Sequence, residues 1–133
     1  MGIKITWDND EKTILRYSFD THWTWDDFYT AKAEAYNQID TVQHKVGVIF
    51  DAPEKITLPA NMITHSKSAV SKTHPNTCIV AVVVRNLYLR TMLSMVMKLS
   101  KKAAETLRLV SSLDEARALV AEKLREANLQ KAS

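Results

Sequence analysis

The feature that most constrains the fold of this chain is a short apolar run, Val-Gly-Val-Ile-Phe-Asp, at residues 46–51. It contains β-branched and aromatic residues, and an acid followed by Ala52 and Pro53 closes it. Such a run is typical of a strand that is buried on both faces of a parallel sheet. Residues 78–84 (Cys-Ile-Val-Ala-Val-Val-Val) show the same pattern. Because parallel strands need long crossover connections, we expect an α/β fold.

The segments around these two strands predict the remaining elements. Residues 3–7 and 13–19 alternate with a period of two around a polar segment, which predicts an antiparallel hairpin. Apolar side chains recur at helical spacing in four stretches, at residues 25–38, 59–71, 86–99 and 112–127. Residues 106–110 are expected to form a short edge strand.

The expected order is β-β-α-β-α-β-α-β-α, a single mixed, mostly parallel sheet with an N-terminal antiparallel hairpin. Capping patterns support two of the helix starts: Thr24 with Asp27, and Ser112 with Glu115. No low-complexity linker divides the 133 residues. We therefore expect one domain spanning residues 1–133, with residues 127–133 as a frayed tail.

Composition excludes several classes of protein. Cys78 is the single cysteine, so an internal disulfide framework is excluded and a reducing cytoplasm is the expected location. The sequence shows no secretory leader, and no apolar run approaches the length that spans a membrane. Gly2 and Gly47 are the two glycines, which makes a glycine-rich phosphate loop impossible and dinucleotide binding improbable. We expect no cofactor.

Charge is distributed unevenly along the chain. Residues 1–60 carry six basic and ten acidic side chains, whereas residues 61–133 carry twelve basic and five acidic ones. Solvated helix faces account for this more simply than a dedicated anion-binding surface does, although the second interpretation predicts an acidic partner. Nucleic-acid binding is unlikely to explain the excess, since few aromatic residues beyond Tyr88 accompany the basic ones.

Polar candidates for a site follow the buried strands. Asp51 lies at the carboxyl end of its strand, where open α/β sheets usually bind ligands. The simpler expectation is that the Asp51 carboxylate accepts hydrogen bonds from N–H groups of the following loop, rather than acting as a general base. His65 and Arg85 would support an enzyme only if the fold brought them to Asp51. The histidines do not have the spacing of metal ligands. We therefore expect no metal site and no enzyme.

The helix expected at residues 86–99 is apolar nearly all round. Tyr88 and Met95 fall outside the stripe that should face the sheet. An uncovered apolar face predicts a contact surface, and a two-fold homodimer is the commonest solution.

Several motifs resemble those of one superfamily. They are the element order, the strand end Val48-Ile49-Phe50-Asp51, the loop into a helix at Leu58-Pro59, and the closing stretch Val-Ser-Ser-Leu-Asp-Glu-Ala at residues 110–116. Together they resemble the STAS-like superfamily of anti-sigma-factor antagonists, also called SpoIIAA-like. The opening Trp-Thr-Trp-Asp-Asp-Phe at residues 23–28 is similar to that of small uncharacterised bacterial members.

The resemblance implies a sheet covered by helices, no cofactor, and function through binding a partner protein. In the antagonists, a serine or threonine in an Asp-Ser-Ser-Gly type motif is phosphorylated at the start of the helix after the central strand. The matching stretch is Thr57-Leu58-Pro59-Ala60, so Thr57 is the candidate phosphosite, although the acid and the glycine of the motif are missing. A plain cap on a helix that begins at Pro59 is the alternative role for Thr57.

The sequence thus predicts a non-enzymatic, self-associating regulatory module that binds a partner protein. Its candidate recognition residues are Asp51, Thr57, Leu58, Met62, His65, Arg85, Tyr88 and Met95. The alternative is a carrier or sensor of a small apolar or anionic ligand, which requires a cavity under the loop at residues 51–59.

Overall fold

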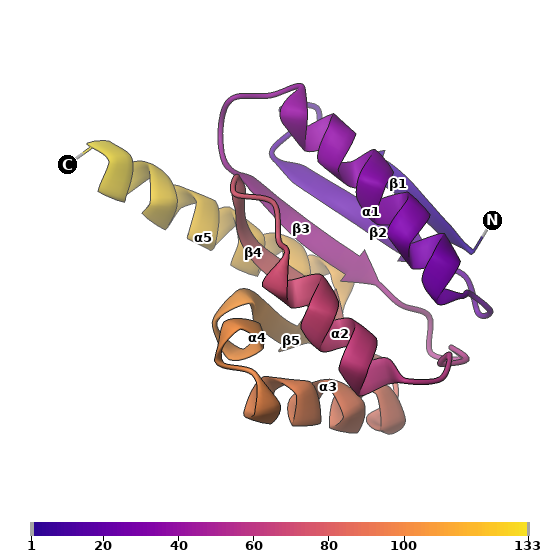
Figure 1. Ribbon diagram of the computed structural model, residues 1–133. Coiled ribbons are helices and arrows are strands. Elements are labelled where there is room, and N and C mark those ends of the chain that lie inside the picture. Colours follow the sequence, from indigo (N-terminus) through magenta and orange to yellow (C-terminus); the bar gives the residue numbers. More distant parts are fainter. Residues whose placement is uncertain (1, 133) are drawn as a thin grey trace.

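The computed structural model of the chain describes residues 2–132, with side chains described for residues 2–129. Over that range the chain forms one five-stranded sheet in the order β1-β2-β3-β4-β5 (Figure 1). The strands are β1 (Ile3–Trp7), β2 (Ile14–Phe19), β3 (Val46–Asp51), β4 (Thr77–Val83) and β5 (Leu107–Val110). β1 and β2 are antiparallel and the other neighbouring pairs are parallel, which confirms the predicted mixed α/β sheet.

Five helices accompany the strands within residues 2–132. They are α1 (Trp25–Asp40), α2 (Met62–Ser71), α3 (Leu87–Leu99), α4 (Lys101–Thr106) and α5 (Leu113–Ala132). Helices α1 to α4 pack on one face of the sheet and α5 packs on the other (Figure 1). The site described below lies on the α1–α4 face.

Side chains at the hairpin and at the helix starts explain where these elements begin. Asn9 holds the β1–β2 turn, because its side-chain oxygen accepts the N–H groups of Thr13 and Ile14 at 3.0 and 3.2 Å. The predicted Thr24–Asp27 capping box is present at the start of α1. Each cap satisfies backbone N–H groups that the first helical turn leaves without partners.

Alternate side chains of the strands enter two separate cores. The larger core lies under α1 to α4, and the smaller one lies under α5. β3 is the middle strand and contributes to both, as predicted for a run buried on both faces. Gly47 in β3 allows α5 to come close, because a Cβ at this position would lie 2.1 Å from Cγ1 of Val120.

Three boundaries differ from those expected. Helix α2 begins at Met62, with Asn61 as its N-cap in the left-handed region (φ 63°), so the expected start at Pro59 is wrong. Thr57 does not cap it; the Thr57 N–H donates to the carbonyl of Thr21 at 2.7 Å. The short helix α4 was not expected and is capped by Ser100. Helix α5 continues to Ala132, past the point where fraying was expected, and Ser133 lies outside the described residues.

Within the described chain, every helix is too short or too polar to cross a bilayer.

Candidate functional site

A cavity of about 110 Å³ lies between α1, α2 and the sheet, and we call it the α1–α2 channel. Its lining extends along α1 from Trp23, just before the helix, to Ile39 near its end. The lining also includes Leu89 and Leu93 of α3 and Leu107 of β5, so the cavity extends across the sheet face as well as along α1. Most of the lining side chains are aromatic or aliphatic, including Phe28 of α1 and Val80 of β4. The channel therefore suits an apolar guest.

Side chains of α1 close the channel toward solvent by reaching across to α2 and to the loop before it. We call this set of contacts the roof. The roof residues of α1 are Trp25, Tyr29, Lys32 and Tyr36. Their spacing of three and four residues places them along one side of the helix. The backbones of α1 and α2 make few close approaches, and the roof joins the two helices through their side chains.

Three roof contacts end on backbone carbonyls. The indole N–H of Trp25 donates to the carbonyl of Ala60 at 2.8 Å, and Nζ of Lys32 donates to the carbonyl of Ala69 at 3.1 Å. The Tyr36 hydroxyl likewise donates to a carbonyl, that of Lys72. Each bond satisfies a polar group directly above an apolar cavity, which keeps the channel itself apolar.

His65 of α2 completes the roof between two aromatic residues. Its ring stacks on Trp25 with centroids 4.6 Å apart and an interplanar angle of 22°. Its Nδ1 is 2.7 Å from the hydroxyl of Tyr29 in a hydrogen bond. The sequence predicted a recognition role for His65, with a solvated helix surface as its alternative environment. The structure instead places the ring, half-buried, at the junction of α1 and α2.

Lys32 is the charged member of the roof. The side chain lines the channel, and its Nζ lies 5.4 Å from the centroid of the Tyr36 ring. Burial, and then the nearby charge of Lys72, lower the pKa of Lys32 below its usual value. Among the side chains described for residues 2–129, no carboxylate lies within ion-pair distance of Lys32. The channel thus has a half-buried cation without a counter-ion.

Trp23 supplies a second unsatisfied donor. This residue lines the channel and is 9% exposed. Its indole Nε1 is buried and has no hydrogen-bond partner in the described part of the chain. Buried N–H groups are nearly always paired, so this one needs an explanation.

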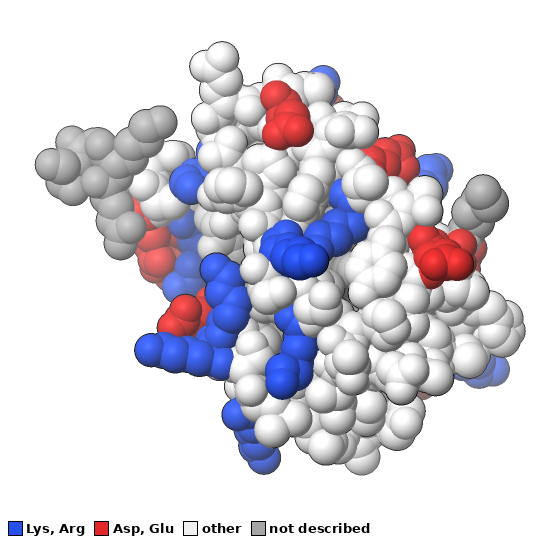
Figure 2. All heavy atoms as spheres, in the orientation of Figure 1, with Lys and Arg blue, Asp and Glu red and all other residues white. Residues whose placement is uncertain are grey.

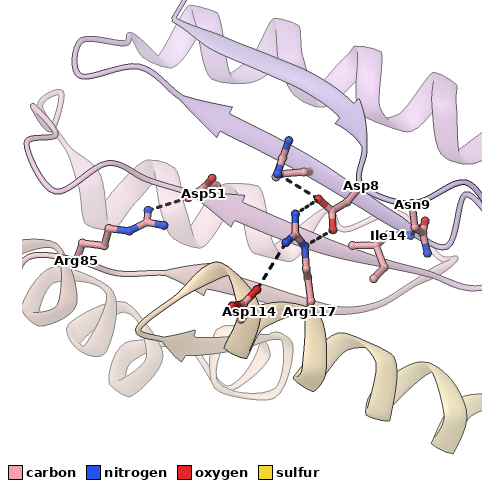
Figure 3. Close-up of polar contacts among 8 residues, drawn as sticks. Asp8, Asn9, Ile14, Asp51, Arg85, Asp114 and Arg117 are labelled. Atoms are coloured by element: carbon pink, nitrogen blue, oxygen red, sulfur yellow. Dashed lines mark hydrogen bonds and ion pairs between the residues drawn. The ribbon is translucent and has the colours of Figure 1, made fainter.

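Asp51 and Arg85 form an ion pair at the carboxyl ends of β3 and β4 (Figure 3). Nη1 of Arg85 lies 2.7 Å from a carboxylate oxygen of Asp51 and also donates to the carbonyl of Ala52 at 2.6 Å. The expected partners of Asp51 were N–H groups of the following loop, whereas the partner found is a guanidinium. This contact ties two strand ends together, which is a structural use of the carboxylate.

The remaining predicted site residues lie in three places. Met62 is buried and lines the channel, whereas Thr57 is exposed and Leu58 half-buried in the loop before α2. Tyr88 and Met95 are exposed on α3. Phosphorylation of Thr57 stays a prediction.

The structure does not bring His65 to the Asp51–Arg85 pair. Among the described residues, His65 contacts Trp25 and Tyr29, whereas Arg85 contacts Asp51 and Ala52. Burial raises the pKa of the Cys78 thiol, which disfavours the reactive thiolate. Burial also raises the pKa of the Tyr17 hydroxyl in the channel well above its usual value, so this phenol stays neutral. Within residues 2–129, no three His, Cys, Asp or Glu side chains are grouped to hold a metal ion.

A second polar cluster joins the hairpin to α5 (Figure 3). The carboxylate of Asp8 is 4% exposed and accepts two hydrogen bonds from Arg117, at 2.7 and 2.9 Å. Nη1 of Arg16 lies 3.1 Å from the same carboxylate. The hydrogen bonds to Asp8 are the main reason that the pKa of Arg117 is raised. The cluster links segments far apart in the sequence and is structural.

Sequence reasoning missed Tyr29 and Lys32. For the helix expected at residues 25–38, the spacing of the apolar residues predicts one stripe on the sheet that includes Trp25 and Tyr36. The observed stripe on the sheet is Phe28, Ala31, Ala35 and Ile39. A signal was present: Trp25, Tyr29, Lys32 and Tyr36 repeat at helical spacing one position away from that stripe. Long side chains beside a core stripe are typical of a contact with a neighbouring helix.

Comparison of the chain with family models, with curated proteins and with solved structures finds no match.

Proposed function

We propose that the chain is a non-catalytic, cytoplasmic binding module of the STAS-like type that holds a small apolar molecule in the α1–α2 channel. The observation that supports this is an apolar cavity that side-chain hydrogen bonds between α1 and α2 cover. Small-molecule sites are typically apolar and concave, with a few placed polar groups. The resemblance of the sequence to the SpoIIAA-like proteins supports the non-catalytic class.

The channel is expected to bind hexanamide, a neutral molecule with a five-carbon tail. Burial contributes about 0.8 kcal/mol per methylene, so a dissociation constant of about 1 mM is expected. Trp23 and Trp25 line the channel, so tryptophan fluorescence and calorimetry can both follow the titration. Ala69→Leu places a larger side chain in the lining and should weaken binding at least about tenfold.

Ala33→Leu is the matched control, because Ala33 is an exposed residue of α1 outside the lining. The control variant should bind hexanamide like the wild type. Absence of binding to the wild type, or equal affinity for wild type and Ala69→Leu, would contradict the proposed function.

The second candidate function is recognition of a partner protein through α3. This helix carries four large apolar side chains that are strongly exposed: Leu87 (77%), Tyr88 (65%), Met95 (42%) and Leu99 (58%). Basic residues accompany them on α3 and α4, including Lys98, Lys101 and Lys102. An acidic partner complements this surface, whereas two copies related by a two-fold axis would bring like charges together. Self-association, expected from the sequence, is the alternative.

Met95→Glu is expected to abolish capture of an acidic partner by the immobilised chain. Leu129→Glu is the control, since Leu129 is a similarly exposed apolar residue on α5. A partner held by charge should elute as salt rises, because screening weakens exposed ion pairs. Light scattering tests the alternative: a dimer that strengthens with salt and is lost in Met95→Glu would establish self-association and remove the acidic-partner proposal.

A further inference from the structure

Two hydrogen-bond donors belong to side chains that line the α1–α2 channel. Lys32 makes one hydrogen bond, to the carbonyl of Ala69, although an ammonium group has three N–H donors. The indole N–H of Trp23 makes none among the described residues. A guest that only filled apolar space would leave the Lys32 ammonium group without a counter-ion. A carboxylate on the guest would supply one.

We propose that the guest is a linear carboxylic acid whose carboxylate binds Lys32 while its aliphatic chain lies in the channel. This inference rests on the proposed function and names the class of ligand. The carboxylate replaces the missing counter-ion of a half-buried ammonium group. The aliphatic chain of the guest fills the cavity between α1, α2 and the sheet.

Electrostatics favours an anion at this position. The nearest charge that acts on Lys32 is another cation, Lys72, and it disfavours the protonated form of Lys32. Figure 2 shows basic side chains where α1 meets α2 on this face. A carboxylate between them would be attracted by both lysines and would remove their mutual repulsion. A charge-assisted hydrogen bond of this kind is about twice as strong as a neutral one.

The lining favours an aliphatic chain as the rest of the guest. Most lining side chains are aromatic or aliphatic, and those of α1 extend from Trp25 to Ile39. A methylene chain can adapt to such a lining by rotation about its single bonds, whereas a rigid ring system cannot.

Hexanoate and hexanamide form a matched pair of probes, because they share the aliphatic chain and differ in charge. Wild type is expected to bind hexanoate about tenfold more tightly than hexanamide at neutral pH and low salt. Lys32→Met keeps an apolar stem and should abolish this preference; the readout is the ratio of the two affinities within each variant, because Lys32 also lines the channel and its loss can change the affinity for both probes. Lys32→Arg should retain most of the preference, because it keeps the charge.

Lys67→Met is the control, since Lys67 is an exposed residue of α2 that does not line the channel. It should behave like the wild type. Equal binding of the two probes to wild type would overturn the carboxylate inference and leave the proposed function standing. A preference that persists in Lys32→Met, or equal weakening of both probes, would remove Lys32 from the site. Binding of neither probe to wild type would contradict the proposed function itself.

Discussion

Replacing Gly47 with alanine is expected to lower the free energy of unfolding by about 3 kcal/mol, the upper end of the usual cost of overpacking. Elsewhere in a strand the same change would stabilise the fold, because glycine loses more backbone entropy on folding. Here the new Cβ would lie 2.1 Å from Cγ1 of Val120, so either the Val120 side chain or the α5 backbone must shift. Urea unfolding of the purified chain measures the effect.

A double-mutant cycle with Val120→Ala separates this clash from other effects. Val120→Ala alone leaves a cavity under α5 and is expected to cost about 2 kcal/mol. In the double variant, the alanine at position 47 occupies part of that space, since the Val120 Cβ would be 3.3 Å from the new Cβ. The double variant should therefore be more stable than the sum of the single effects predicts, by about 2 kcal/mol. Strict additivity would show that the contact with Val120 does not limit position 47.

Asp8→Ala is expected to lower the free energy of unfolding by about 3 kcal/mol, a cost typical of removing one partner from a buried ion pair. The substitution leaves the guanidinium groups of Arg16 and Arg117 without their shared carboxylate. Both arginines are partly exposed, so water compensates them in part and the cost stays near the lower end of the range. Thermal unfolding would also show earlier loss of α5 from the hairpin.

Asp114→Ala is the control for this prediction. Asp114 faces the same arginine, Arg117, at 3.7 Å, but its carboxylate is 97% exposed. Exposed ion pairs contribute little, so the expected change is under about 0.5 kcal/mol. Equal effects of the two substitutions would mean that Asp8 acts as an ordinary surface residue and that the cluster does not hold the hairpin to α5.

Hydrophobic patterning predicted the strands and the four longer helices, because burial determines where apolar side chains recur. β3 was predicted from a continuous apolar run: a glycine, β-branched residues and a phenylalanine leave no polar face, so both faces of the strand had to be covered. The start of α2 was missed for the opposite reason. Pro59 and Thr57 are locally well suited to a helix start, but the loop is held by the contact of Thr57 with Thr21, which lies far away in the sequence.

The roof was missed because helical spacing does not identify the neighbour of a helix face. Trp25 and Tyr36 have the same periodicity as the residues that pack on the sheet, and the sequence says nothing of where α2 lies. The volume of the channel depends on the distance between α1 and α2, and all the side chains between the two helices determine that distance. The role of Lys32 could therefore be identified only from the position of α2.

The roof also determines how quickly the channel can exchange its contents. Each hydrogen bond in it contributes about 1 kcal/mol net, and together they hold α1 against α2 far less firmly than the two cores hold the sheet. Separation of α1 and α2 is therefore a local opening that does not require global unfolding. A guest of the proposed kind would enter during such openings, so its association rate would fall below the value for an open surface site. Its residence time would depend on how often α1 and α2 separate as well as on its affinity for the lining.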